Sequence, residues 1–510
     1  MKNLKGLWLC GMVLLFAHQI FAQSFAETAL LFSRTQPGGS ARIQGMGGAQ
    51  VALGGDYSSA YSNPAGLGMY NHSEFTFTPG LNFTNTSADY LNGNTKDSKS
   101  TFGLPGLSIA FHNDAPKMKG LLSGTFAISF NRINDFNRNL TYSGNNKNNS
   151  IIDYFLDDAT GGTPAQFQSS GALYNTPTGL AYDTYLIGEA TILDPSYSNK
   201  EYFTDISEGA EAYQEETVEQ RGYQNQWNFS YGVNVGDKFF VGAGLGIASI
   251  RYTAKKVYTE SFTDEPLSNL RLEENLDIRG PAFNGTLGVI FRPIDFIQVG
   301  LSAVTPTSYR LTDTYSANMD AYWKNFEYLP GEFINHESSE TDIVTSDYGL
   351  KTPWKFSTGI AVFIQKHGFL TADAEFISYD NSKYVARTSQ AGYSSSDDFS
   401  GDNETINELY QSVVNLRLGG EYRYNKFRFR GGYGIMPEPF KTQQNGVSRI
   451  IQNISGGAGF RSENFFVDLA VIYGQGNNSY RPYRVASASS PVVTYNQNKT
   501  SFLVTIGFPF

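Results

Sequence analysis

The chain has very little cysteine and, after its first 22 residues, no long apolar run. Cys10 is the only cysteine, and it lies in the leading segment. A mature chain that starts after this segment has no thiol for a disulfide, a nucleophile or a metal ligand. A stretch of about 18 apolar residues, as a transmembrane helix needs, is missing after residue 22. Charged residues make up only 17 % of the chain and the formal net charge is -10, which argues against nucleic acid as a partner.

Glycine and aromatic residues, in contrast, are abundant. The sequence has 52 Gly, 38 Phe and 32 Tyr. A β-barrel in a membrane needs an apolar side chain only at every second strand position, so it crosses the bilayer without a long apolar run. This composition is typical of such a barrel.

The first 22 residues have the pattern of a secretory signal peptide. Lys2 and Lys5 precede an apolar core at residues 7–16, and residues 20–22 form a cleavage site before Gln23. A membrane anchor is the competing interpretation, but the apolar run is short and is followed by His18 and Gln19. We therefore predict a signal peptide over residues 1–22 and export of the chain to the outer membrane of a Gram-negative cell.

From residue 74 onward, hydrophobicity alternates with the two-residue period of a strand. Phe502, Val504, Ile506, Phe508 and Phe510 share one face of the last segment. An aromatic last residue, Phe510, resembles the signal that barrel-assembly machinery recognises. The alternation predicts strands near residues 74–84, 104–113, 120–133, 226–236, 238–255, 277–292, 295–311, 353–365, 368–386, 410–424, 426–436, 447–460, 464–474 and 499–510.

The connections between these strands alternate between tight turns and long loops, as expected across an outer membrane. A soluble sandwich has no reason to sort its loops by length. The prediction is an all-β protein: a 14-stranded antiparallel transmembrane β-barrel over residues 74–510, with both termini periplasmic. The longest extracellular loop is predicted at residues 134–225, folded over the barrel mouth, with a helix near residues 206–220.

Residues 23–73, before the first strand, are dense in glycine and end in Asn63-Pro64-Ala65-Gly66. A dinucleotide-binding loop is excluded, because its glycines follow a strand and precede a helix. A periplasmic tail is the simplest alternative, but Ile43, Val51 and Leu53 would then be exposed to water. We predict that this segment is a hatch inside the barrel lumen.

The order of these segments resembles the FadL family of outer-membrane transporters of long-chain fatty acids and other hydrophobic compounds, as a Bacteroidetes-like member. The resemblance rests on residues 45–49 (Gly-Met-Gly-Gly-Ala), 54–56 (Gly-Gly-Asp) and 63–67 (Asn-Pro-Ala-Gly-Leu), with weaker matches later in the barrel. It implies a hatch-closed barrel in which a hydrophobic ligand enters from the outer loops. The ligand then leaves sideways into the bilayer where one strand kinks inward, without ATP or TonB coupling.

Two neighbouring strands place basic side chains on their inward faces. The candidate lumen contacts to a ligand or to the hatch are Arg417, Glu421, Arg423, Arg428 and Arg430, with Asp373 and Glu375 nearby. An anionic head group or a hatch carboxylate such as Asp56 would pair with the guanidinium groups. An ordinary polar network of the lumen is the other interpretation. Asn63, Pro64, Ala65 and Gly66 are expected to be a structural site of the hatch rather than a ligand contact.

An enzyme is not expected, because no histidine has the acidic or serine partners of a hydrolase. His336, followed by Glu337 and Glu340, is the nearest approach to a metal cluster, and no metal or other cofactor is predicted. The expected partners of this monomer are a hydrophobic ligand, outer-membrane lipid or lipopolysaccharide, and barrel-assembly machinery. Two other functions stay open: a polar-solute porin, and a surface receptor or adhesin, with haem as one ligand, that uses the long loops.

Overall fold

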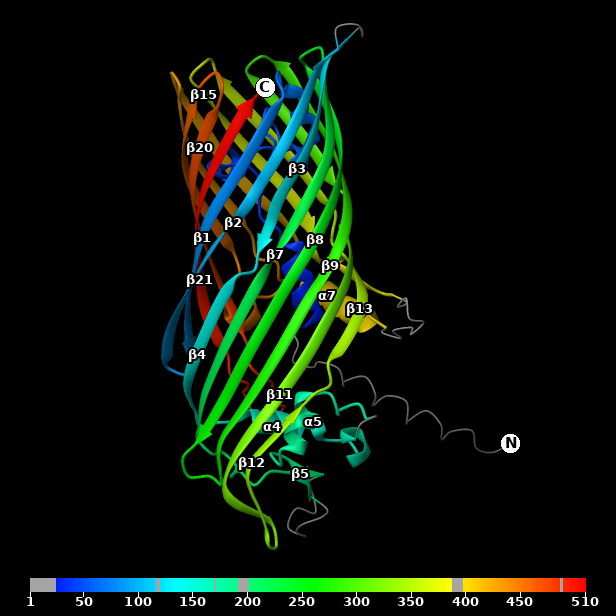
Figure 1. Cartoon of the computed structure of the whole chain (residues 1–510), viewed down its shortest axis with the longest axis vertical. Coiled ribbons are helices and arrows are strands. Elements are labelled where there is room, and N and C mark those ends of the chain that lie inside the picture. Colours follow the sequence, from blue (N-terminus) through cyan, green and yellow to red (C-terminus); the bar gives the residue numbers. More distant parts are fainter. Residues whose placement is uncertain (1–23, 116–119, 169–170, 191–200, 388–397, 487–488) are drawn as a thin grey trace, which may run out of the picture.

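The computed structural model describes residues 24–115, 120–168, 171–190, 201–387, 398–486 and 489–510. The predicted signal peptide lies outside the described residues. The described chain forms one long barrel of tilted strands, with a few short helices inside it and at one end (Figure 1). No helix among the described residues is long and apolar enough to span a membrane.

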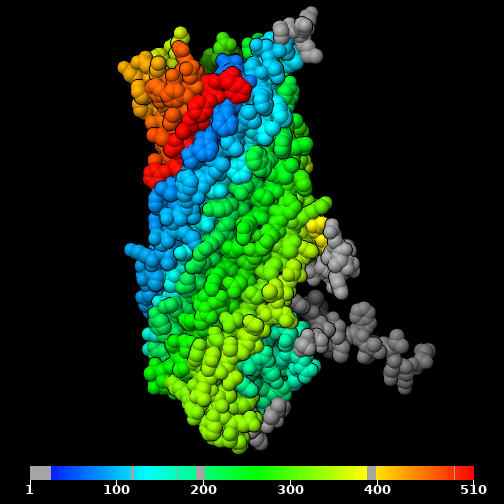
Figure 2. All heavy atoms as spheres, in the orientation of Figure 1, coloured from blue at the N-terminus to red at the C-terminus, as the bar shows by residue number. Residues whose placement is uncertain are grey.

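Fourteen antiparallel spans of the described chain close into the barrel, as the alternation predicted. Several spans are broken into two or three strands. In order they are β1 (Glu74–Tyr90), β2 (Gly93–Asp114), β3 (Leu121–Asp135) with β4 (Arg138–Asn146), β7 (Ala212–Val235), β8 (Phe239–Phe262), β9 (Leu267–Ile294), β10 (Ile297–Val304) with β11 (Ser308–Leu329), β12 (Glu332–Glu340) with β13 (Val344–Lys351) and β14 (Lys355–Ile364), β15 (Gly368–Ser378) with β16 (Lys383–Ala386), β17 (Ser412–Tyr424), β18 (Phe427–Met436), β19 (Ile451–Arg461), β20 (Phe466–Tyr480) and β21 (Val493–Pro509). The barrel closes where β1 pairs with β21, and these two strands lie side by side in Figure 2.

The two ends of the barrel differ. One end, which we call the short-turn end, carries tight connections such as residues 236–238, 365–367 and 425–426. Phe510 lies there, where its backbone N–H donates to Ser73 O at 2.9 Å. The opposite end, which we call the long-loop end, carries the longer connections. The segment that precedes β1 starts far from the short-turn end, because Phe25 packs against Tyr348 of β13 and Tyr384 of β16.

An apolar band surrounds the half of the barrel nearest the short-turn end. On β8, for example, Phe239, Val241, Ala243, Leu245 and Ile247 are exposed, while the alternate residues face inward. Large exposed apolar side chains occur at corresponding positions of the neighbouring strands. A band of alternating apolar side chains is the lipid-facing surface of a transmembrane barrel.

Strands continue far beyond this band toward the long-loop end. β7 and β8 each have 24 residues and β9 has 28, whereas about 9–11 residues span a bilayer. β4 and the first half of β7 therefore occupy both ends of the predicted 134–225 loop. The predicted helix at residues 206–220 is wrong, because strand β7 begins at Ala212. Its inward residues include the buried Gln214 and Glu216, so hydrophobicity does not reveal the strand.

The residues between β4 and β7 cover the long-loop end. It contains α4 (Ile151–Ala159), η2 (Pro164–Phe167), α5 (Pro177–Asp183), β5 (Gly188–Glu189) and β6 (Tyr202–Phe203). Buried Phe155 and Leu180 share one apolar core with Leu270 of β9 and Trp323 of β11. Beside this apolar core, Gln214 Nε2 donates to Glu260 Oε1 at 2.7 Å and to Tyr483 Oη at 2.7 Å. Side chains from several strands of the barrel thus meet across this end, where Figure 1 shows α4, α5 and β5.

Residues 24–73 lie inside the barrel wall. They contain α1 (Phe25–Ser33), α2 (Ala41–Gln44), α3 (Ser59–Ser62) and η1 (Pro64–Met69). Ala41 N donates to Thr505 Oγ1 of β21 at 2.8 Å, and Ser230 Oγ of β7 donates to Ala60 O at 2.8 Å. The remaining helices are η4 (Tyr379–Asn381), α7 (Ser400–Leu409) and η5 (Gln444–Gly446). We call residues 24–73 the N-terminal segment.

Candidate functional site

Glycines on the inward faces of the strands make room for the N-terminal segment. Gly232, Gly242 and Gly288 are direct cross-strand neighbours on β7, β8 and β9. A methyl group on Gly242 would stand 2.3 Å from the carbonyl carbon of Pro64, and one on Gly288 would stand 1.8 Å from Asn63 Oδ1. Residues 63–68 therefore lie directly on the backbone of the wall, and any side chain at these glycines would displace them.

The same arrangement recurs around the lumen. A methyl group on Gly300 of β10 would stand 2.1 Å from Val51 O, and one on Gly432 of β18 would stand 2.1 Å from Gly47 N. Residues 45–49 and 51–52 thus contact the wall through backbone, not through long side chains. Part of the glycine content of the strands is explained by this close approach.

Asn63 is the fully buried centre of the Asn-Pro-Ala-Gly motif. Its Nδ2 donates to Val51 O at 2.6 Å, and its Oδ1 accepts from Ala65 N at 3.2 Å. Pro64 begins η1, where a missing backbone N–H costs nothing. The motif joins two parts of the N-terminal segment. This geometry suits the structural role predicted for it.

Carboxylates of the barrel wall accept hydrogen bonds from the N-terminal segment and form an ion pair with it. Asp373 Oδ2 on β15 accepts from Gln50 N at 2.6 Å and from Val51 N at 2.9 Å. Glu421 Oε2 on β17 lies 3.5 Å from Arg42 Nε. Burial disfavours the charge on Arg42, but Glu421 and Asp56 outweigh it and raise the pKa of that guanidinium. In this part of the lumen, carboxylates of the wall therefore bind backbone N–H groups and a guanidinium group of the N-terminal segment.

Asp56 does not pair with the wall arginines as the sequence suggested. Its carboxylate accepts from Ser40 Oγ at 2.7 Å and from Ser58 N at 3.0 Å, and lies 3.9 Å from Arg42 Nη1. Asp56 therefore stabilises the fold of the N-terminal segment itself. Its basic partner, Arg42, was not identified from the sequence, because an isolated Arg in a glycine-rich stretch has no pattern that marks it.

The predicted lumen arginines are largely satisfied by neighbouring acids. Arg417 Nη2 donates to Glu375 Oε1 at 2.7 Å. Arg430 bridges Glu421 Oε2 at 2.8 Å and Asp468 Oδ1 at 2.7 Å. Arg423 Nε also donates to Glu421, at 2.8 Å. The geometry therefore favours the polar-network interpretation, in which these groups stabilise the lumen.

Replacing Arg430 by Met should destabilise the barrel by about 3 kcal/mol, because two buried carboxylates lose a shared partner. Arg428→Met is the matched control, since Arg428 Nη1 donates only to the turn carbonyls of Asn425 and Phe427, at 2.7 and 2.8 Å. We expect the control to lose less than about 1 kcal/mol. Urea unfolding in lipid vesicles measures both, and equal stability of the two variants would contradict the network.

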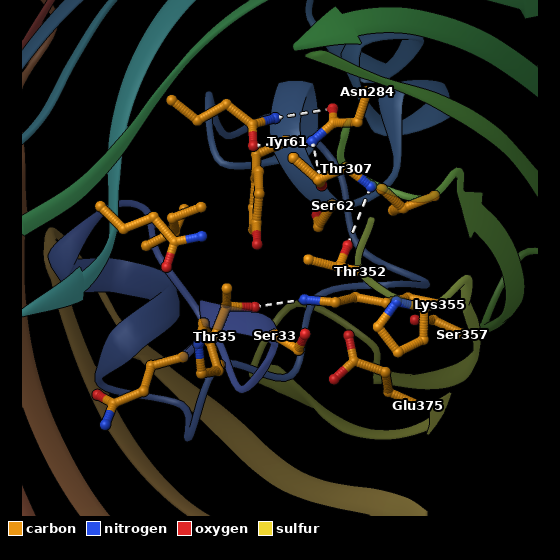
Figure 3. Close-up of a pocket in the computed structure, with 18 of the residues that line it drawn as sticks. Ser33, Thr35, Tyr61, Ser62, Asn284, Thr307, Thr352, Lys355, Ser357 and Glu375 are labelled. Atoms are coloured by element: carbon orange, nitrogen blue, oxygen red, sulfur yellow. Dashed lines mark hydrogen bonds between the residues drawn. The ribbon is translucent and has the colours of Figure 1, made fainter. Parts of the chain in front are cut away.

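One cavity between the N-terminal segment and the wall is small and has a mixed lining of polar and apolar side chains (Figure 3). Its volume is about 50 Å³, and its lining includes Tyr61, Asn284, Thr307, Lys355 and Glu375. Lys355 Nζ donates to Thr35 Oγ1 of the segment. Cavities that hold a benzene ring measure about 150 Å³ and are apolar. At about 50 Å³ this cavity is too small for a ligand of that size.

A second lumen cavity is larger and amphiphilic. It has a volume of about 250 Å³ and lies between α1 and the wall strands β3, β4, β7, β8, β19, β20 and β21. Its apolar lining includes Leu30, Leu31, Phe136, Leu140, Val218 and Ile451, and its charged lining consists of Glu27, Arg34, Asp135, Arg138, Lys256 and Arg449. Four of these groups are basic and two are acidic. We call it the amphiphilic cavity.

Next to the amphiphilic cavity, the wall loses its backbone pairing. β2 and β3 pair from Asp114↔Ser123 to Gly106↔Asn131 and no further. Beyond that point β4 pairs only with β7. Side chains replace the backbone ladder: Thr141 N donates to Asp97 Oδ2 at 2.6 Å, and Lys99 Nζ donates to Asn139 Oδ1 at 2.9 Å. Among the described residues, this leaves residues 93–105 of β2 paired on one side only.

β3 bends into the lumen at this break. Asp135 Oδ2 accepts from Asn82 of β1 at 2.9 Å and from Lys499 of β21 at 3.1 Å, so it reaches past β2. Pro105 supplies no N–H at the point where the ladder stops. On the other side, Gly222 of β7 has φ +121° and accepts from Phe136 N at 3.0 Å. A proline on one neighbour and a left-handed glycine on the other thus cause the kink.

The side chain of Arg132 fills the outer part of this break. Its guanidinium lies 3.6 Å from the centroid of the Tyr223 ring. A methyl group on Gly103 of β2 would stand 2.5 Å from Arg132 Nη1. Flanking it, Phe102 is 75 % exposed on the apolar band. The wall is therefore closed here by a long, movable side chain in place of hydrogen-bonded backbone.

The sequence matches no family model and no curated relative. Solved structures match over nearly the whole chain. The Pseudomonas putida toluene transporter TodX is 12 % identical, with 93 % of this chain and 99 % of that chain covered and a TM-score of 0.51. A Pseudomonas aeruginosa FadL homologue is 11 % identical, with the same coverage and a TM-score of 0.55. The chain has the fold of the FadL-type transporters.

At this level of identity the FadL-type fold is what the neighbours share with the chain, and these neighbours are transport proteins. His336, the nearest approach to a metal site in the sequence, contacts Asp320 Oδ1 at 3.2 Å and stacks on Tyr322. No group of three or more His, Cys, Asp or Glu side chains among the described residues could hold a metal ion.

Proposed function

We propose that the chain takes up hydrophobic small molecules passively across the outer membrane and releases them sideways into the bilayer. The break between β2 and the β3–β4 span carries this proposal. It lies between the amphiphilic cavity, which Asp135, Phe136 and Leu140 line, and the lipid-facing surface, so that movement of the Arg132 side chain would join the two. A ligand that leaves there avoids passing its apolar part through periplasmic water, which costs about 25 cal/mol per Å² of apolar surface.

The amphiphilic cavity favours a ligand with an apolar body and an anionic end, such as a long-chain fatty acid. Its volume of about 250 Å³ exceeds the roughly 150 Å³ that holds benzene. Arg138 Nη1 donates to Tyr495 Oη at 2.6 Å, so its position is fixed at the cavity wall. A carboxylate would meet Arg138 and Arg449, while its chain contacts Leu140, Val218 and Ile451.

The contacts of the N-terminal segment with the barrel wall support a role as a hatch rather than as a periplasmic tail. It contacts the wall strands through the glycine row of β7, β8 and β9, and through Gly300 and Gly432 elsewhere. In an open pore for polar solutes, a segment inside the lumen would only obstruct diffusion. In this proposal the long-loop end faces outward and the short-turn end, with Phe510, faces the periplasm, where the barrel-assembly role of Phe510 remains a prediction.

Uptake of a labelled fatty acid tests this function. Cells that lack their own uptake protein are given the wild-type chain or its Arg138→Gln/Arg449→Gln variant, at equal amounts of folded barrel. We expect fatty acid uptake only with the protein, and at least about tenfold less in the variant. Toluene uptake should change little in the variant. No uptake of either compound, with steady conductance for polar solutes, would overturn the proposal in favour of a porin.

A further inference from the structure

A row of basic side chains follows the outer surface just beyond the apolar band, toward the long-loop end. All of its members are exposed, and they come from six neighbouring spans. We call it the basic row: Arg221 of β7, Arg251 of β8, Arg279 of β9, Arg310 of β11, Lys351 of β13 and Lys383 of β16. β7, β8 and β9 form a continuous outer face here (Figure 2).

Strand register places like charges directly opposite one another in this row. Arg251 is the cross-strand partner of Arg279, and Lys351 is the partner of Lys383. Like charges in directly opposite positions destabilise a sheet. Arg251, Arg310, Lys351 and Lys383 have no hydrogen bond or ion pair to another described side chain. An anion outside the barrel wall would relieve this repulsion.

On three strands of this surface, an acidic residue lies beyond the basic residue of the row. On β7, Arg221 lies nearer the apolar band, and Glu219, 2.7 Å from it, lies one outward position further away. On β9, Arg279 and Asp277 repeat this order, also at 2.7 Å. Lys351 and Asp347 follow it on β13. On these three strands the positive charge therefore lies nearer the lipid head groups, with a negative charge beyond it.

Four described strands on the other side of the barrel have uncharged outward residues in a corresponding cross-strand row. There the outward cross-strand neighbours Ser98, Asn85, Asn498 and Gln475 occupy β2, β1, β21 and β20. All four are uncharged. The basic row is consequently a local feature of one face, and not a general property of the barrel surface.

We propose that the basic row binds the phosphate groups of a phosphorylated glycolipid in the outer leaflet. The acyl chains would lie against the apolar band, where exposed Trp227 and Trp354 mark its edge. The phosphates would contact Arg251, Arg279 and Arg310 through charge-assisted hydrogen bonds. The inference rests on the outward orientation of the long-loop end that the proposed function assigns, but not on the transported ligand.

Lipid binding to the purified barrel tests the row. Native mass spectrometry in a mild nonionic detergent measures retention of diphosphorylated lipid A by the wild type and by the variant Arg251→Gln/Arg279→Gln/Arg310→Gln/Lys351→Gln. The control replaces the exposed Lys96, Lys238, Lys366 and Lys426 by Gln, an equal change in charge outside the row. We expect about tenfold weaker binding in the row variant and unchanged binding in the control. Lipid A without its phosphates should bind the wild type as weakly as intact lipid A binds the row variant.

Equal lipid A binding by wild type and row variant would overturn the proposal, as would equally tight binding of dephosphorylated lipid A. Displacement of the lipid by millimolar inorganic phosphate alone would do so too, since it indicates a free-phosphate site. If the fourfold variant does not assemble, Arg251→Gln/Arg279→Gln tests the same point, because it removes a repulsive pair and should fold at least as stably. Fatty acid uptake is expected to survive in the row variant, so failure of uptake and failure of lipid binding are distinguishable.

Discussion

The variant Gly432→Val should conduct ions steadily in planar bilayers, whereas the wild type stays silent. A side chain at Gly432 would have its first carbon 2.1 Å from Gly47 N and 2.1 Å from the Met46 carbonyl carbon. Both atoms belong to backbone, and no flexible side chain can move aside to make room. The N-terminal segment therefore has to move off the wall. Without the segment the polar interior of the barrel is open to water. Single-channel recording measures the opening.

Gly431→Val is the matched control for this experiment. Gly431 is the neighbouring residue on β18, and nothing lies within 4 Å of a methyl group placed on it. It faces outward, so the control should remain silent and fold normally. Limited proteolysis of the N-terminal segment gives a second readout, with cleavage expected only in Gly432→Val. A silent, protease-resistant Gly432→Val barrel would show that the segment does not seal the lumen.

Cross-linking β2 to β4 should reduce fatty acid uptake by at least about tenfold. Thr141 N and Thr141 Oγ1 lie 2.6 and 3.3 Å from the Asp97 carboxylate, across the break in the ladder. Asp97→Cys/Thr141→Cys places two thiols there, in a mature chain with no other cysteine, because Cys10 belongs to the predicted signal peptide. A short bis-methanethiosulfonate reagent then joins the strands, and a reductant cleaves the link.

The cross-linked protein is its own control, since reduction should restore uptake. A second pair, Asn85→Cys/Asn498→Cys, joins β1 to β21 at directly opposite positions where the backbone ladder is intact. Its cross-linking should leave uptake unchanged. Uptake that is insensitive to the β2–β4 link would rule out release at this break.

The barrel could be predicted from the sequence because lipid imposes a simple period on it. The outward residues of the last strand, from Phe502 to Phe510, alternate with inward ones, and 14 such spans form the structure. The pattern failed at β7, where the inward residues Gln214 and Glu216 are polar. Toward the long-loop end the inward faces carry buried polar residues beside apolar ones such as Leu270 and Trp323, so hydrophobicity gives a weaker period there.

The candidate site was only partly predictable. Alternation placed Arg417 and Arg430 on the inner face, where both are buried, but it could not show that they form ion pairs with Glu375, Glu421 and Asp468. The lining residue Arg138 of the amphiphilic cavity was missed, because the kink that positions it depends on Pro105 and Gly222, on other strands. One usable signal was present: inward glycines such as Gly242, Gly288 and Gly432 mark where the wall receives other backbone.

The most direct test of sideways release is to map where a hydrophobic ligand touches the barrel during uptake. A fatty acid with a diazirine in its chain is photolysed in intact cells, and the labelled residues are identified by mass spectrometry. The account predicts labelling at Phe136 and Leu140 in the amphiphilic cavity and at Phe102 and Arg132 in the break. Ala41, Ala470 and Leu503 pack together between α2 and strands β20 and β21, nearer the short-turn end. Labelling there instead would mean that the ligand passes along the barrel axis and would contradict release into the bilayer.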